Sequence, residues 1–395
     1  MGQILDFWRR KRRPPAPFPL ALLVAILSLF AAHPSLGQSA AAPRPATVAA
    51  RPLDRTATLL LPGFGNAIGI AVSGTHAYVV DAGIGHRIIV VDIADPAAPR
   101  VVGTLSDLFR LNGAFTVRVA GHYAYVTAAG SGRLEIIDMA RPDRPVFAAG
   151  IADARLAGAR GLFLAGRYAY VAGNASGSLV IIDVADPLHP VVAGSLTDPV
   201  RLAGADSVVV DGHHAYVTAG AANALVVLDV ADPAAPAIVG SLEDKFALGN
   251  AKELVVRNGL AYVASLAGDS LAIVDVSTPS APVLLGAARG ALLDGAKNLT
   301  LDGDIAYVTA NSGGRLTLVG VADPRAPAIL RSTADGEPLP DARGVVVAGS
   351  RVLVVARDRL TIFAIARDAG PVDAGPVAAG RVEAGRGAAG GTQYR

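Results

Sequence analysis

The stretch Ser178–Pro190 reads SLVIIDVADPLHP, and it decides the fold because the chain repeats it. Its aliphatic and β-branched run is typical of a buried strand, and the Asp-Pro-x-x-Pro element that follows ends the strand in a turn. The other copies are RIIVVDIADPAAP at Arg87–Pro99, RLEIIDMARPDRP at Arg133–Pro145, ALVVLDVADPAAP at Ala224–Pro236, SLAIVDVSTPSAP at Ser270–Pro282, RLTLVGVADPRAP at Arg315–Pro327 and a degenerate RLTIFAI at Arg359–Ile365.

A second motif, Ala-Tyr-Val, lies upstream of each copy. Its tyrosine recurs at Tyr78, Tyr125, Tyr170, Tyr216, Tyr262 and Tyr307, and Leu353 takes its place in the last copy. Each period holds four short strand-like runs bounded by Gly, Asn, Asp or Pro, and these runs are apolar almost throughout, which favours sheets buried on both faces. Four strands in a period of about 45 residues are typical of propeller blades. The sequence therefore predicts an all-β, seven-bladed β-propeller of four-stranded blades.

The two ends of the repeat region predict how the ring closes. The last copy stops after its third strand at Ile365, whereas Thr56–Asn66 resembles the fourth-strand segment Arg100–Gly113. An N-terminal strand that completes the last blade would remove two exposed sheet edges. We therefore expect the propeller to span residues 56–365, with its last blade closed by the N-terminal strand.

The repeated segments resemble the bacterial and archaeal LVIVD-repeat family, whose name matches the strand that reads LVIIDV at Leu179–Val184. The resemblance covers roughly residues 56–365. It implies an exported or cell-surface β-propeller, and it says nothing about the ligand. The chain departs from the pattern at Gly320, where the strand aspartate is missing, and throughout the seventh copy.

The segments outside the repeats predict export. Residues 1–37 have the layout of a signal peptide: a basic run at Arg9–Arg13, an apolar run at Leu20–Ala32, and small residues before Gln38. We expect cleavage and a periplasmic, secreted or cell-surface protein; the alternative is an uncleaved leader, which would then be the chain's only contact with a membrane. Residues 38–55 read as an Ala/Pro-rich linker, and residues 366–395 as a disordered Ala/Gly-rich tail.

Composition excludes several functional classes. The chain has no Cys, so disulfides and Cys-ligated metals are absent. It is 52% hydrophobic, yet no apolar run after the leader approaches the roughly 20 residues of a membrane helix. Its charges nearly balance, without a long basic run, so we expect no nucleic-acid partner. No catalytic, phosphate-binding or metal-binding motif is found, so we predict no catalytic residue, metal or cofactor, and we expect a monomer.

Two sets of repeated polar residues are predicted to be structural. A ring of identical carboxylates is a poor active site, because catalysis needs unlike groups at one point. We expect each repeated aspartate to accept hydrogen bonds within its own turn and each repeated tyrosine to pack between blades. The aspartates are Asp92, Asp138, Asp183, Asp229 and Asp275, and the tyrosines are those of the Ala-Tyr-Val motif.

One feature differs from blade to blade. The residue 11 positions before each motif tyrosine, or before Leu353, is always alanine, and the residue after that alanine opens the innermost strand at the channel mouth. Around the ring it reads Ile68, Phe115, Arg160, Asp206, Lys252, Lys297 and Arg343, with Glu253 and Asn298 next in their strands. Such a rim could hold an anionic or amphipathic ligand. Alternatively, the charges pair across blades and merely line a wet pore.

These features favour a non-enzymatic binding or scaffold protein. Its loop face and channel mouth would bind a protein partner or an anionic small-molecule or polymer ligand. The alternative is a hydrolase or lyase that acts on an extracellular polymer or small anion at the same mouth; it requires converging acidic or His groups with shifted pKa values. The third possibility is a purely structural envelope component, which would have neither an exposed binding patch nor such a cluster of acidic or His groups.

Overall fold

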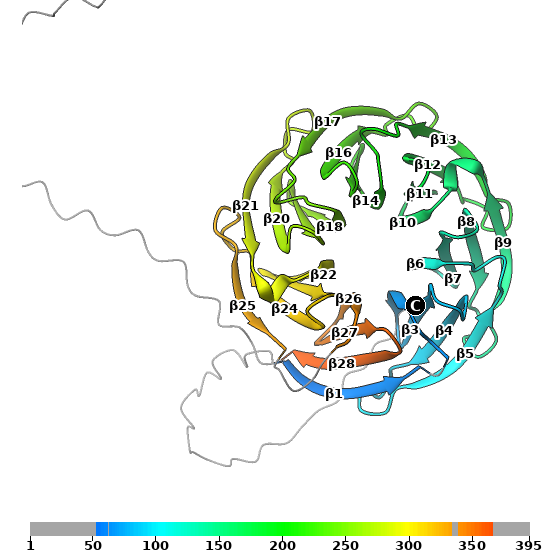
Figure 1. Ribbon diagram of the computed structural model, residues 1–395. Helices are drawn as coiled ribbons and strands as arrows, with labels where there is room; N and C mark the ends of the chain where they lie inside the picture. The colour runs from blue at the N-terminus through cyan, green and yellow to red at the C-terminus, as the bar shows by residue number, and fades with distance from the viewer. Residues whose placement is uncertain (1–52, 62, 334–338, 366–395) are drawn as a thin grey trace, which may run out of the picture. The chain divides into compact units, whose positions relative to one another are not determined.

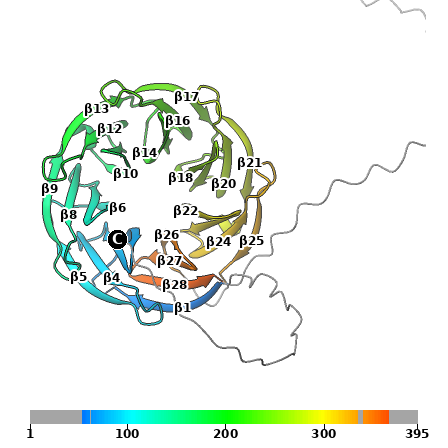
Figure 2. The same ribbon diagram turned by 180° about the vertical axis from the view of Figure 1, so that it is seen from behind.

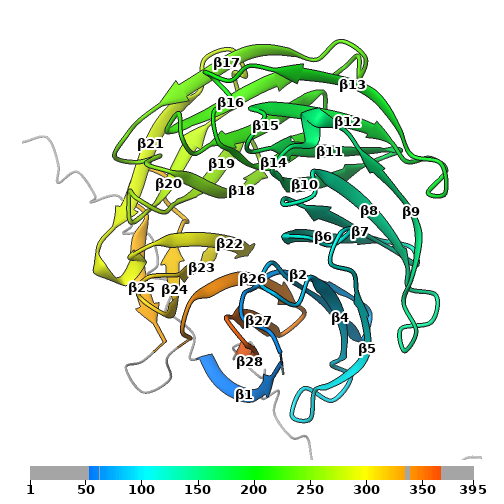
Figure 3. The same ribbon diagram turned by 45° about the vertical axis from the view of Figure 1, so that its right-hand side comes forward.

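The computed structural model describes residues 53–61, 63–333 and 339–365. Within these residues, seven four-stranded antiparallel sheets surround a central channel, and the first strand of each blade is innermost (Figure 1). Figure 3 shows the same ring from an oblique direction. The predicted all-β, seven-bladed propeller is therefore confirmed.

The blades follow one another along the chain. Blade 1 comprises β2 (Ala67–Ser73), β3 (His76–Asp81), β4 (Arg87–Asp92) and β5 (Arg100–Ser106), and blade 2 comprises β6 (Ala114–Ala120), β7 (Tyr123–Ala128), β8 (Arg133–Asp138) and β9 (Val146–Ala152). Blade 3 comprises β10 (Ala159–Ala165), β11 (Tyr168–Gly173), β12 (Ser178–Asp183) and β13 (Val191–Thr197), and blade 4 comprises β14 (Ala205–Asp211), β15 (His214–Ala219), β16 (Ala224–Asp229) and β17 (Ala237–Glu243). Blade 5 comprises β18 (Ala251–Arg257), β19 (Leu260–Ser265), β20 (Ser270–Asp275) and β21 (Val283–Arg289), and blade 6 comprises β22 (Ala296–Asp302), β23 (Ile305–Ala310), β24 (Arg315–Gly320) and β25 (Ala328–Ser332). Two single-turn 3₁₀ helices, η1 (Ala154–Leu156) and η2 (Ala291–Leu293), lie in connections between blades.

Blade 7 joins the two ends of the propeller. It comprises β26 (Ala342–Ala348), β27 (Arg351–Ala356), β28 (Arg359–Ile365) and the N-terminal strand β1 (Leu53–Leu60). Strand β1 pairs antiparallel with β28, with Thr58 opposite Thr361 and Leu60 opposite Arg359 (Figure 2). The predicted closure is confirmed, and the strand begins at Leu53 rather than at Thr56.

Hydrophobic clusters fill the spaces between neighbouring blades. In one of them Tyr216 of blade 4 packs with Leu248 and Leu254, which belong to the approach to blade 5 and to its first strand. The six motif tyrosines are all buried in clusters of this kind. Burial of both faces of each sheet explains why the strand segments read as continuous apolar runs.

The Asp-Pro-x-x-Pro turns pack against the fourth strand of the blade before them. In blades 1, 3, 4 and 5 that strand carries a glycine beside its bulge, and the turn of the next blade lies directly against the glycine. Blades 2 and 6 have Ala149 and Arg331 at this position. At Gly240 of blade 4, a Cβ would lie 2.2 Å from the carbonyl oxygen of Pro279 in blade 5. At Gly194 of blade 3, it would lie 2.1 Å from the carbonyl oxygen of Pro233 in blade 4. These contacts explain why the fourth strand has a glycine where the turn of the next blade packs against it.

Each repeated aspartate holds the start of its own turn. Asp183 accepts a hydrogen bond from the N–H of Ala185 at 3.0 Å, and Asp275 accepts one from the N–H of Ser277 at 2.9 Å. The equivalent bonds join Asp92 to Ala94, Asp138 to Ala140 and Asp229 to Ala231.

The predicted signal peptide (1–37) and C-terminal tail (366–395) lie outside the described residues, as does the predicted linker up to residue 52. Among the residues that are described, no helix has the length and apolar character needed to cross a membrane.

Candidate functional site

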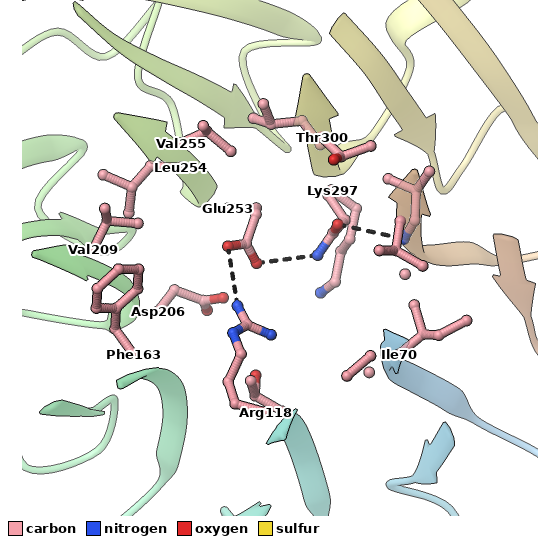
Figure 4. A pocket seen from close by; sticks show the side chains of 18 of the residues that line it. Ile70, Arg118, Phe163, Asp206, Val209, Glu253, Leu254, Val255, Lys297 and Thr300 are labelled. Carbon is pink, nitrogen blue, oxygen red and sulfur yellow. Dashed lines mark hydrogen bonds and ion pairs between the residues drawn. The ribbon is translucent and has the colours of Figure 1, made fainter. Parts of the chain in front are cut away.

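The central channel encloses a cavity of about 790 Å³. Its wall is built by the first strands of all seven blades, β2, β6, β10, β14, β18, β22 and β26 (Figure 4). The alanine that opens each of these strands is fully buried, so the residues after it are the first that can face the channel.

Along these strands the wall residues form two tiers. The first tier is the residue directly after each opening alanine: Ile68, Phe115, Arg160, Asp206, Lys252, Lys297 and Arg343. The second tier is the residue four positions after the alanine: Ala71, Arg118, Phe163, Val209, Val255, Thr300 and Val346. All seven second-tier residues line the cavity, and so do the first-tier residues other than Arg160 and Lys252.

Asp206 is the centre of a buried ionic cluster. It is only 6% exposed, and its Oδ2 accepts hydrogen bonds from Arg160 Nη1 at 2.7 Å and from Lys252 Nζ at 3.0 Å. Burial opposes ionisation of this carboxyl, but the positive charges of Lys252, Arg160 and Lys297 outweigh it and hold the pKa of Asp206 below its ordinary value. Asp206 thus pairs with one cation from each of the two neighbouring blades, and neither of these cations is among the residues that line the cavity.

Glu253 is the second carboxylate of the cavity. Its Oε1 accepts a hydrogen bond from Ser207 Oγ at 2.9 Å, and its Oε2 accepts one from Asn298 Nδ2 at 3.0 Å. Arg118 Nη2 reaches from blade 2 on the far side of the channel to within 4.0 Å of Glu253 Oε1 (Figure 4). Burial outweighs these contacts and raises the pKa of Glu253.

Lys297 differs from the other first-tier cations, because no carboxylate of the described residues forms an ion pair with it. In the part of the chain that the structure describes, its Nζ has no hydrogen bond and no ion pair, and Figure 4 shows the side chain extending into the cavity. Nζ lies 5.9 Å from the centre of the Phe115 ring, which comes from blade 2 across the channel. Burial, together with the positive charges of Lys252, Arg343 and Arg160, lowers the pKa of Lys297 to about 8, although Asp206 opposes the shift.

Arg343 is held at the edge of the same wall. Its Nη2 donates to both carboxylate oxygens of Asp341 at 3.1 Å, and Asp341 also accepts a hydrogen bond from Asn311 Nδ2 at 2.6 Å. The Nε of Arg343 is buried without a hydrogen-bond partner among the described residues.

The structure sorts the seven predicted ligand-binding residues into two groups. Asp206, Glu253, Lys297, Asn298 and Arg343 line the cavity together, whereas Arg160 and Lys252 pair with Asp206 and do not line it. Charge pairing across blades therefore accounts for Arg160, Asp206 and Lys252, but not for Lys297.

Arg118 is a cavity residue that the sequence analysis missed. It is the one charged residue of the second tier, and that position in the repeat is the signal that could have revealed it. Among the described residues, no group of three or more His, Asp or Glu side chains could hold a metal ion.

Comparisons with known proteins agree with the fold. The model of the LVIVD repeat matches residues 64–107, 113–151, 158–198, 204–244 and 248–288, which make up more than half of the chain. No curated protein shows a significant sequence match.

Solved structures with the same fold differ widely in sequence. Virginiamycin B lyase from Staphylococcus aureus aligns with a TM-score of 0.62 at 8% identity, over 78% of this chain and 99% of that chain. A protein from Lactobacillus plantarum aligns with a TM-score of 0.61 at 16% identity, over 72% and 89% of the two chains. BamB from Moraxella catarrhalis aligns with a TM-score of 0.50 at 14% identity, over 76% and 83%. These similarities establish the fold alone.

Proposed function

The chain belongs to the LVIVD repeat family, and from this premise we propose that it is an exported binding protein that holds a small anion in its central channel and catalyses no reaction. The observation that carries this proposal is the Lys297 ammonium group in the cavity, which has no hydrogen bond or ion pair with any of the residues that the structure describes. A charged group removed from bulk water is costly unless it is paired, and a bound anion would supply the missing partner.

The charge of the wall supports the same conclusion. Six cationic side chains and four carboxylates lie in the wall or pair with its residues: Arg118, Arg160, Lys252, Arg257, Lys297 and Arg343, and Asp206, Asp211, Glu253 and Asp341. The raised pKa of Glu253 reduces the negative charge further as the pH falls. The surplus of positive charge would draw anions into the channel and hold them there.

The test is calorimetric titration of the full chain with acetate, chloride, sulfate and inorganic phosphate. Lys297→Gln removes the charge at nearly constant length, and we expect it to weaken binding of the preferred anion at least tenfold. Lys245→Gln is the matched control, because Lys245 lies on the exposed surface. Equal affinity of both variants for every anion would contradict the proposal.

A hydrolase or lyase that uses Glu253 as a general acid is the second candidate. The raised pKa of Glu253 favours it, because a general acid must hold its proton until the reaction step. Against it, no histidine lines the cavity in the described part of the chain, and two cations bound to Oδ2 keep Asp206 ionised. This candidate would be favoured if the protein turns over an anion that it binds, and if Glu253→Gln abolishes turnover but retains binding.

A further inference from the structure

We infer that the ligand is an amphipathic monocarboxylate, whose head group binds Lys297 and whose aliphatic tail lies against the second tier. This inference rests on the proposed function and names the ligand class of the same cavity. Three features of the wall support it: the separation of polar from apolar residues along the strands, the charge balance near Lys297, and the size of the cavity.

The polar and apolar residues of the wall occupy different levels. Charged groups dominate the first tier, together with Glu253 and Asn298 next to it. In the second tier the wall is apolar at Ala71, Phe163, Val209, Val255 and Val346, and Ile70 adds to it (Figure 4). Arg118 and Thr300 are the polar members of the second tier. A ligand whose head group lies beside Lys297 and Arg118 can therefore place an alkyl chain against the apolar second-tier residues, which is the pattern of a carboxylate with an alkyl chain.

The charge near Lys297 favours a single negative charge on the ligand. Asp206 and Glu253 line the same cavity, and both would repel a dianion such as phosphate. A carboxylate can accept hydrogen bonds from the free Lys297 Nζ. It can also accept them from Arg118, whose guanidinium stands 4.0 Å from Glu253, outside hydrogen-bond distance.

The cavity is large enough for a chain of several methylene groups. Its volume of about 790 Å³ lies within the usual range of small-molecule sites. Each methylene buried against the second tier should tighten binding about fourfold until the chain leaves the apolar wall. Inorganic anions gain nothing from that wall.

The experiment is calorimetric titration of the full chain, below pH 8, with acetate, butanoate, hexanoate, octanoate, octan-1-ol and inorganic phosphate. We expect the dissociation constant to fall stepwise from acetate to octanoate by about fourfold per methylene. Octanol should bind at least tenfold more weakly than octanoate, and Lys297→Gln should abolish that difference.

A second-tier variant tests the tail. Val255→Asn, which adds polarity without charge, should flatten the dependence on chain length while leaving acetate affinity within a few fold. Val255→Thr gives the same direction with a nearly isosteric side chain if the asparagine variant does not fold. Val239→Asn is the matched control, because Val239 is 36% exposed on the outer strand β17.

The possible failures are distinguishable. Anion binding without any dependence on chain length, or phosphate binding more tightly than octanoate, would overturn this inference and leave the proposed function standing. Octanol binding as tightly as octanoate would overturn the assignment of the head group to Lys297. Binding of none of the anions would overturn the proposed function itself.

Discussion

Lys297 should titrate far below an ordinary lysine. With a pKa of about 8, about one in ten Lys297 side chains is unprotonated at pH 7, against about one in three thousand for a lysine at 10.5. The cause is burial in the channel among Lys252, Arg343 and Arg160, so the shift requires the folded ring. The sign is fixed: the cation is present below about pH 8 and is lost as the pH rises through that value.

Competitive amine labelling with quantification by mass spectrometry measures this pKa. The chain contains only four lysines, Lys11, Lys245, Lys252 and Lys297, so each can be followed separately between about pH 6 and about pH 11. Lys245 is exposed and serves as the internal standard. The midpoint of labelling, rather than its rate, is compared, because the rate also depends on how easily the reagent enters the channel.

Two outcomes decide the reasoning. We expect a midpoint near 8 for Lys297, and saturating octanoate should move it upward, because a ligand that prefers the protonated form stabilises it. Anion affinity should fall over the same range of pH. A midpoint for Lys297 that coincides with that of Lys245 would refute the account of its environment.

Three further predictions concern stability, each measured by urea unfolding unless stated. Asp206→Ala leaves Lys252 buried without its carboxylate and should lower the free energy of unfolding by about 3–5 kcal/mol. The control Asp211→Ala, at an exposed site, should lower it by less than about 0.5 kcal/mol. Equal effects of the two variants would contradict the buried cluster. Gly240→Ala places a Cβ 2.2 Å from the Pro279 carbonyl oxygen and should lower the free energy of unfolding by about 1–3 kcal/mol. The control Gly65→Ala meets no atom within 4 Å and should not lower it. If Gly240→Ala has no effect, the contact between turn and strand does not hold the two blades together. Deletion of residues 1–60 removes β1 and exposes the edge of β28. Thermal unfolding should then lose its sharp transition, and the protein should associate on a sizing column. A variant that stays monomeric and unfolds sharply would show that closure by β1 is dispensable.

The fold was predictable because each repeat contains the residues that determine its own strands and turns. The Asp-Pro-x-x-Pro turns, the buried tyrosines and the apolar runs all repeat, so blade number and closure follow from counting along the chain. The side chains that face the channel were harder to predict. Each first strand has a bulge just after its opening alanine, as between Ala251 and Leu254, and a bulge breaks the simple alternation of faces.

The bulge explains why counting from the alanine did not identify Arg118 and did not show that Lys252 pairs with Asp206. Counting from the alanine identifies the start of the strand, but it does not say which of the next residues faces the channel. The approach of Arg118 to Glu253 depends on the width of the ring and on side-chain length, and it joins blades 2 and 5. No local pattern in the sequence encodes that contact.

The two tiers have a consequence for how such proteins diversify. The residues that hold a blade together, such as the opening alanine, the motif tyrosine and the turn aspartate, are separate from those that face the channel. Apart from Asp206 and the cations paired with it, each of the seven strands thus contributes wall positions that can vary with little effect on its blade. New binding specificities could therefore arise by exchanging single side chains, or by recombining whole blades from different copies, without redesign of the framework.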